Sequence, residues 1–400
     1  MSIALKITRR RSPRSAINEV GIHKAVQRTG PCGSIAGLLE AFLYDGHVCM
    51  AYEKHGRSLD DEINTRLLTP AQTLAVTRQM LDALAHLHGA GFSHTDLKPD
   101  NILYDRRTGI ARLADLGNAE RELATGTSLC TREYTPPEVL LGAPLTPAID
   151  HWSLGCTVFE MLTGELLFNP RAIAATKYKE FHFDDDEDSP DEPLPAAEAA
   201  DRAEEAAEQY SSGTVIAGKY RLEKELGRGR FGTVWSAEII ADVPLDGSFA
   251  TLWQHCQEKE SQRPPRSESE RLARVWKKHK GADDLRDLAL NHEHLLLMDR
   301  LCGPLPPALI RAGTFQHSFF TPEGRFRHPG TSGPESMAAH IAECAPRVSK
   351  SHLDQFSRII STLCHIDPAK RSVIPDCDLT LSSARSRGIR RMPRPVNWRS

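Results

Sequence analysis

The sequence predicts an α+β protein, because short apolar runs with strand character are combined with longer segments of helical spacing. Strand character occurs at Ile3–Thr8 and His47–Glu53. It occurs again much later, at Tyr220–Glu238, where two apolar runs flank a glycine-rich turn. Apolar residues three and four positions apart predict helices at Thr73–His88 and Leu353–Ile366. With 40% apolar residues, the chain can bury a sizeable core.

The overall composition argues against several classes of protein. The formal net charge is −3, so the chain has no overall excess of basic residues that would bind nucleic acid or an anionic membrane surface. No apolar run reaches the length of a membrane span. The nine cysteines are scattered without a CxxC pair, so we expect reduced thiols and a cytoplasmic or nuclear location. The histidines show no metal-ligand spacing, and we expect most of them at the surface or at helix ends.

The most informative motif runs from Ser93 to Leu103, directly after a predicted helix, and reads Ser-His-Thr-Asp-Leu-Lys-Pro-Asp-Asn-Ile-Leu. Transfer of a phosphoryl group to a hydroxyl needs positioning and charge neutralisation more than covalent chemistry. Asp96 can accept the proton of the hydroxyl, and Lys98 can reach the transferring phosphate. The amide oxygen of Asn101 can bind a metal ion. The motif therefore predicts a site for phosphoryl transfer.

Two further motifs follow at a spacing that fits this chemistry. Leu113-Ala-Asp-Leu-Gly-Asn-Ala places the carboxylate of Asp115 at a turn, where it can bind a magnesium ion that bridges phosphates. The run from Cys130 to Gly142 resembles the end of the activation segment of serine/threonine kinases, and this resemblance implies that Thr131 lies beside Asp96 and Lys98. It also carries Glu138, a carboxylate expected to be buried and to need a cationic partner, for which Arg371 is the candidate.

Together these motifs resemble those of eukaryotic-type protein kinases. The sequences His-Thr-Asp and Asp-Leu-Gly-Asn-Ala, with Gly303–Gly313 and Phe319–Gly324, are most similar to the SR-protein kinase family. The resemblance implies a two-lobed fold with a small β-rich N-lobe and a larger helical C-lobe. It also implies a serine/threonine kinase that transfers the γ-phosphate of ATP, with Mg²⁺, to serine in basic, Arg/Ser-rich proteins. We expect a monomer that contacts neither nucleic acid nor membrane.

The same resemblance assigns the nucleotide-binding residues. Ile3-Ala-Leu-Lys-Ile matches the lysine strand, so Lys6 is expected to pair with Glu19 in a helix over Ser15–Arg28 and to order the phosphates. The backbone at Glu53 is expected to meet the adenine. The glycine-rich loop is assigned to Leu226–Trp235. Its glycines would let backbone N–H groups approach the phosphates, at Gly227, Gly229 and Gly232. Val234 would cover the adenine.

This glycine-rich hairpin follows the lysine strand in the chain, whereas kinases have it before that strand, so the segment is interpreted as transposed. A flexible linker of about 45 residues spans roughly 35–40 Å, enough to bring the hairpin back to the sheet. The sequence leaves open whether the hairpin docks in cis, in trans or not at all. It also leaves open a misassembled gene and, as an alternative function, a pseudokinase or scaffold with a defective ATP site.

The expected organisation places the hairpin and the first strands in one lobe. The acidic run Asp184–Glu192 predicts a disordered linker, and basic residues gather in the tail. The segments are 1–53 (N-lobe: lysine strand, helix, hinge strand), 54–170 (C-lobe), 171–216 (acidic linker), 217–238 (glycine-rich hairpin), 239–290 (charged linker or insert), 291–380 (C-lobe helices) and 381–400 (basic tail).

Overall fold

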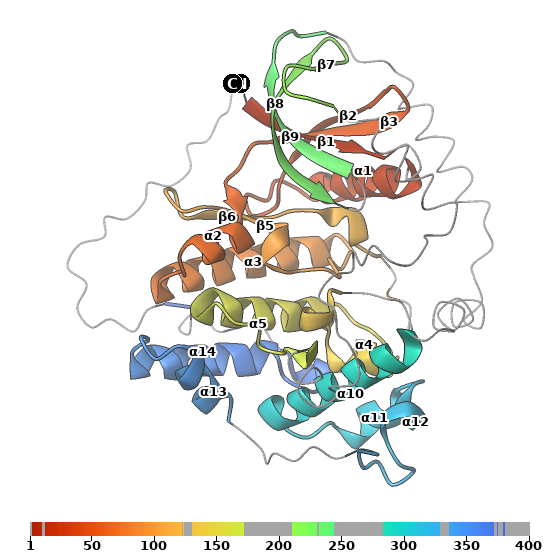
Figure 1. Cartoon of the computed structure of the whole chain (residues 1–400), viewed down its shortest axis with the longest axis vertical. Helices are drawn as coiled ribbons and strands as arrows, with labels where there is room; N and C mark the ends of the chain where they lie inside the picture. The colour runs from red at the N-terminus through yellow and green to blue at the C-terminus, as the bar shows by residue number, and fades with distance from the viewer. Residues whose placement is uncertain are drawn as a thin grey trace.

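The computed structural model describes residues 2–9, 13–121, 123, 130–171, 210–229, 232–243, 283–328, 336–371, 374 and 379–380. An antiparallel sheet with one long helix forms the upper lobe, and a larger group of helices forms the lower lobe (Figure 1). The expected two-lobed α+β fold is therefore confirmed. Most of the acidic linker, most of the charged insert and the basic tail lie outside the described residues.

Strand β1 (Ser2–Thr8) lies inside the upper sheet, between β3 (His47–Glu53) and β9 (Gly232–Ile239). The sheet has the order β2-β3-β1-β9-β8-β7. Side chains alternate between the two faces of a strand, so Ile3, Leu5 and Ile7 are buried on one face while Lys6 points to the other. The alternation of β1 thus delivers a lysine to the face that looks toward the lower lobe.

Helix α1 (Pro13–Arg28) covers this face of the sheet. Its residues Ala16, Ile17 and Val20 pack against Val48 and Met50 of the sheet in one apolar cluster. The packing fixes α1 against the strand β3, and the ion pair between Lys6 and Glu19 joins it to β1. The helix predicted at Ser15–Arg28 is confirmed.

The lower lobe is built around α5 (Ala148–Thr163), most of whose residues are buried. Helix α3 (Pro70–Gly89) begins at a capping box made by Thr69 and Gln72, and α14 (Lys350–Leu363) packs on the other side of α5. In the part of the chain that is described, no helix is both long and apolar enough to cross a bilayer. The remaining elements are β2 (Leu38–Tyr44), β4 (Arg57–Ser58), α2 (Leu59–Thr65), β5 (Ile102–Asp105), β6 (Ile110–Leu113), α4 (Pro137–Leu141), α10 (Asp283–Cys302), α11 (Pro307–Ala312), α12 (Gln316–Phe319) and α13 (Met337–Cys344).

The distant hairpin joins the upper sheet of the same chain. Strand β8 (Tyr220–Gly229) pairs with β9, and β9 pairs with β1 over its whole length, with Leu5 opposite Trp235. Two expected boundaries shift. Residues Val215–Ile216 form β7, because Ile216 is buried beside Tyr220, so the acidic linker ends earlier than expected. Helix α10 starts within the expected insert, at Asp283.

Candidate functional site

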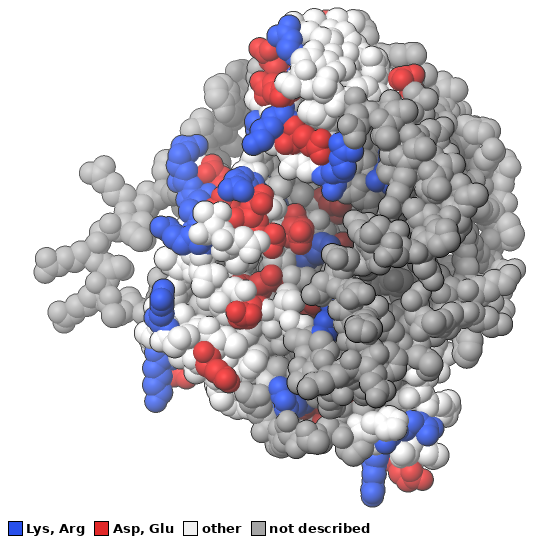
Figure 2. All heavy atoms as spheres, in the orientation of Figure 1, with Lys and Arg blue, Asp and Glu red and all other residues white. Residues whose placement is uncertain are grey.

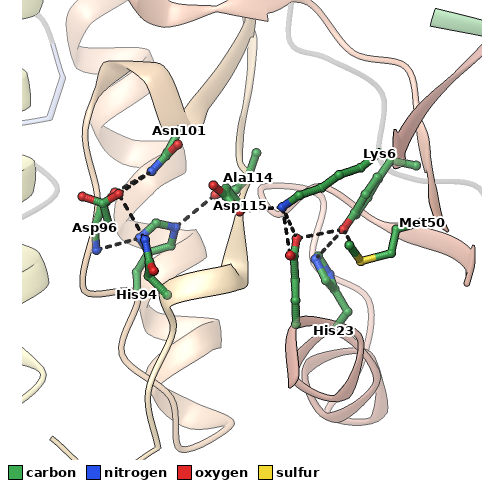
Figure 3. Close-up of polar contacts among 11 residues, drawn as sticks. Lys6, His23, Met50, His94, Asp96, Asn101, Ala114 and Asp115 are labelled. Carbon is green, nitrogen blue, oxygen red and sulfur yellow. Dashed lines mark hydrogen bonds and ion pairs between the residues drawn. The ribbon is translucent and has the colours of Figure 1, made fainter. Parts of the chain in front are cut away.

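Three charged side chains meet between the two lobes, although they come from β1, α1 and the turn after β6 (Figure 3). The Nζ atom of Lys6 lies 2.9 and 2.8 Å from the two carboxylate oxygens of Glu19 and 2.9 Å from Oδ1 of Asp115. An added Cβ at position 117 would come within 3.1 Å of the Asp115 carboxylate and 3.2 Å of the Glu19 carboxylate, so a larger residue there would press on both. The expected contact between Lys6 and Glu19 is present, and Asp115 joins it.

The charges of this group stabilise one another. Burial opposes the charged form of Lys6, but the two carboxylates outweigh it and raise the Lys6 pKa. Burial raises the pKa of Glu19, with Lys6 opposing that effect. Burial also acts to raise the pKa of Asp115, but the charge of Lys6 outweighs burial, so the pKa of Asp115 is lowered. The ammonium of Lys6 is thus held protonated and directed toward the place where a phosphate would bind.

Two residues behind this group were not foreseen from the sequence. The hydroxyl of Tyr52 donates to Glu19 at 3.1 Å and lies 3.5 Å from Nε2 of His23. Burial, followed by the charge of Lys6, lowers the pKa of His23 to about 3, so the imidazole is neutral. The only sequence signal was position, since Tyr52 ends the apolar run of β3 and His23 lies one helical turn after Glu19.

The second half of the site is the loop before β5, where Asp96 and Lys98 face Thr131. The hydroxyl of Thr131 donates to Oδ1 of Asp96 at 2.7 Å and accepts from Nζ of Lys98 at 2.9 Å. The side-chain amide of Asn101 donates to the carbonyl of Asp96 at 2.8 Å. These four side chains, predicted from separate motifs, lie together as expected. Their chemical roles stay predictions.

A buried carboxylate fixes the backbone of this loop. Asp150 of α5 is fully buried and accepts the backbone N–H groups of His94 and Thr95, both at 2.8 Å. Burial opposes its charge, but the bond from His88 lowers the pKa of Asp150. Thr95 has a positive φ of 68°, a backbone conformation that costs free energy outside glycine. Asp150 therefore holds a strained turn that presents Asp96.

The donor set for a metal ion consists of Asn101 and Asp115. Because the Asn101 amide nitrogen is directed to Asp96, its oxygen is the atom left for a cation. Among the described residues no group of three or more His, Cys, Asp or Glu side chains could hold a metal ion by itself. A pair of oxygen donors fits Mg²⁺, which usually takes its remaining ligands from phosphates and water.

The hairpin places its glycines above the Lys6 group. Val234 lies opposite Lys6 in the sheet, and Gly227 lies opposite Val234. Gly229 pairs with Gly232, where an added Cβ would lie 2.2 Å from the carbonyl oxygen of Ile7. Residues 230 and 231, at the tip, lie outside the described residues.

Glu53, the residue expected at the adenine, ends β3 with an exposed side chain and pairs with Ile3. The structure therefore leaves its backbone contact with a nucleotide a prediction.

The expected pair of Glu138 and Arg371 is present. Nη2 of Arg371 donates to Oε2 of Glu138 at 2.8 Å, and the second pair of atoms, Nη1 and Oε1, is also bonded. The guanidinium stacks 4.9 Å from the ring of Trp152 and also donates to the carbonyl of Ala148 at 3.2 Å. This bidentate contact ties α4, near Thr131, to the end of the described chain.

Comparison with known proteins agrees with this geometry. The family profile described as protein kinase domain matches residues 2–204. The serine/threonine-protein kinase prp4 of Schizosaccharomyces pombe is 31% identical over 182 residues, which cover 42% of this chain and 38% of that protein. Serine/threonine-protein kinase AFC3 of Arabidopsis thaliana is 34% identical over 155 residues, covering 32% and 38%. The chain thus spans less than half the length of these curated relatives.

Proposed function

The chain belongs to the protein kinase family, and we propose that it transfers the γ-phosphate of ATP to serine or threonine hydroxyls in basic protein segments. One observation carries the proposal. The hydroxyl of Thr131 lies between a carboxylate that can accept a proton, Asp96, and an ammonium that can neutralise a phosphate, Lys98. A substrate hydroxyl that took the same position would be directed in the same way.

The roles in the proposed reaction follow from the contacts. Lys6, held by Glu19, would orient the α- and β-phosphates, and the glycines of the hairpin would let backbone N–H groups approach them. Asn101 and Asp115 would hold Mg²⁺, whose chemistry is to neutralise charge on the phosphates. Asp96 would take the proton of the attacking hydroxyl, and Lys98 would offset negative charge that develops on the transferred group.

An acidic surface supports the preference for basic substrates. Asp100 lies in the catalytic loop, and Glu133 follows Thr131 closely. Burial, followed by the charges of Asp60, Asp100 and Glu133, raises the pKa of Glu160 to about 7. In the space-filling view, acidic side chains gather in the middle of the face below the sheet (Figure 2). An arginine of a substrate would relieve this repulsion, which is why we infer Arg-containing segments such as Arg/Ser repeats.

The first test measures transfer of labelled phosphate from ATP to an Arg/Ser repeat peptide. Wild type should be active, and Asp96→Ala should lose nearly all activity while retaining its melting temperature and its ATP binding. A wild-type protein that is folded but transfers no phosphate would contradict the proposal and favour the pseudokinase or scaffold.

A second test concerns substrate preference. Asp100→Asn combined with Glu160→Gln should lower kcat/KM for the Arg/Ser peptide by roughly 10- to 100-fold, because the loss of one hydrogen bond between charged groups costs about 1.5–3 kcal/mol. The matched substrate has lysine and arginine replaced by alanine, and its much lower rate should change little. Equal effects on both peptides would refute the inferred role of the acidic surface.

A further inference from the structure

A cavity of about 530 Å³ lies beside the segment that connects the two lobes. Its walls come from the start of β1, from residues 54–56 after β3, and from the β5–β6 hairpin. None of the side chains assigned above to phosphoryl transfer lines it. The volume is within the range of cavities that accommodate small ligands. The cavity is therefore a separate site.

Two cations line this cavity, and neither forms an ion pair with a carboxylate among the described residues. Arg112 of β6 forms no hydrogen bond or ion pair with the residues the structure describes, although its guanidinium is partly buried. The ammonium of Lys54 donates to the hydroxyls of Ser236 and Ser2, at 2.7 and 3.4 Å, which hold it without cancelling its charge. A guanidinium without a partner, beside a fixed ammonium, is a configuration that attracts an anion.

The one carboxylate in the lining is already engaged. Oδ1 of Asp105 accepts the backbone N–H groups of Arg107 and Thr108, at 2.9 and 3.4 Å, and its Oδ2 lies 3.7 Å from Arg107. His55, whose side chain is 7% exposed, stays neutral and adds no charge to the cavity, because burial and then the charge of Arg112 lower its pKa. The cavity therefore keeps a net positive charge near neutral pH.

The remaining lining groups indicate the chemistry of the ligand. The hydroxyls of Ser2 and Thr108 can donate to oxygen atoms, and Ile110, which is 40% exposed, offers an apolar wall. Figure 2 shows Lys and Arg side chains among acidic ones where the sheet meets the helices. We propose that this cavity binds an oxyanion, the phosphate or carboxylate group of a small molecule or of a peptide side chain, between Arg112 and Lys54.

Inorganic phosphate is the first probe. With phosphate at about ten times its Kd, and chloride used to match ionic strength, the melting temperature of the full chain should rise by about 2 °C, and it should rise further with the logarithm of the phosphate concentration. Arg112→Gln should abolish the rise. The control is Arg311→Gln in α11, an exposed arginine that does not line the cavity, and it should retain the rise. Lys6→Met should also retain it, since Lys6 belongs to the nucleotide site.

Ile110→Glu is a second variant, which places a negative charge in the cavity at a half-exposed position and should abolish the rise as Arg112→Gln does. Acetate and a phosphoserine peptide then distinguish the sources of the anion by isothermal titration. A rise that survives both cavity variants, or that disappears in Lys6→Met, would overturn the proposal. So would a wild type whose melting temperature does not rise with phosphate beyond the chloride control.

Discussion

At the scale of single residues, the Lys6 group depends on how Glu19 is held. Glu19 is 3% exposed and receives hydrogen bonds from Lys6 and from the hydroxyl of Tyr52. A buried carboxylate that loses a donor is destabilised, because no water replaces the bond. Tyr52 should therefore act as a positioning residue for the Lys6–Glu19 pair, without touching the nucleotide phosphates itself.

Tyr52→Phe keeps the ring and removes only this donor. We expect the free energy of unfolding to fall by about 1–3 kcal/mol and the Kd for Mg·ATP to rise. Urea denaturation and nucleotide titration measure the two effects. Tyr44→Phe is the control, because the hydroxyl of Tyr44 makes no hydrogen bond with the described residues. If both variants behave alike, the bond to Glu19 has no positioning role.

At the scale of elements, α10 carries a histidine whose burial the sequence did not indicate. His294 is fully buried and packs against Phe168, and neither ring nitrogen has a hydrogen-bond partner among the described residues. Burial lowers its pKa from 6.5 to about 3. Between these values the unfolded chain binds a proton that the folded chain does not, so stability falls as pH falls, by at most ~1.4 kcal/mol per pH unit.

His294→Leu should remove this share of the pH dependence. Between pH 6 and 5 the variant should lose about 1 kcal/mol less stability than wild type, and at pH 7 it should be no less stable, since an unsatisfied polar ring is replaced. Urea denaturation at pH 7, 6 and 5 measures both. His317→Leu, an exposed position, controls for the loss of a histidine. A variant slope equal to that of wild type would contradict the argument.

Two glycines of the β8–β9 hairpin allow a test of whether its contact with β1 positions it. Gly232→Ala places a Cβ 2.2 Å from the carbonyl oxygen of Ile7 and should cost about 1–3 kcal/mol, because β9 must move away from β1. Gly227→Ala, with no atom within 4 Å of the added Cβ, is the matched control. Thermal melts should separate them. Equal losses would mean that the contact with β1 does not position the hairpin.

Most elements could be predicted because they carry local patterns. The alternation of buried and less buried residues in β1, and the helical spacing of apolar residues in α1, α3 and α14, can be recognised from neighbouring residues alone. The start of α10 could not be foreseen, since Asp283 follows a charged stretch without clear periodicity and only tertiary packing of Leu290 and later residues defines it. Of the two residues that donate hydrogen bonds to Glu19, the sequence predicted one. Lys6 follows from a motif, whereas Tyr52 follows from no pattern except its place at the end of a strand.

At the scale of the whole molecule, segments far apart in sequence must meet to complete each lobe. β9 pairs with β1 in the upper sheet, and Arg371 pairs with Glu138 in the lower lobe. Such long-range contacts raise the contact order, so we expect slow folding. The free energy of unfolding of each lobe therefore depends on a few contacts between segments that are distant in sequence.

The Glu138–Arg371 pair allows that dependence to be measured. Arg371→Met leaves a fully buried carboxylate without its partner and should cost about 3–5 kcal/mol of unfolding free energy. Glu138→Gln with Arg371→Met should cost less than the single Arg371→Met, because no buried charge remains unpaired. The exposed Arg311→Met should have little effect. Additive losses in this double-mutant cycle would show that the pair does not couple the two segments. A double variant more stable than Arg371→Met would show that compensation of charge is what joins α4 to the distant C-terminal segment.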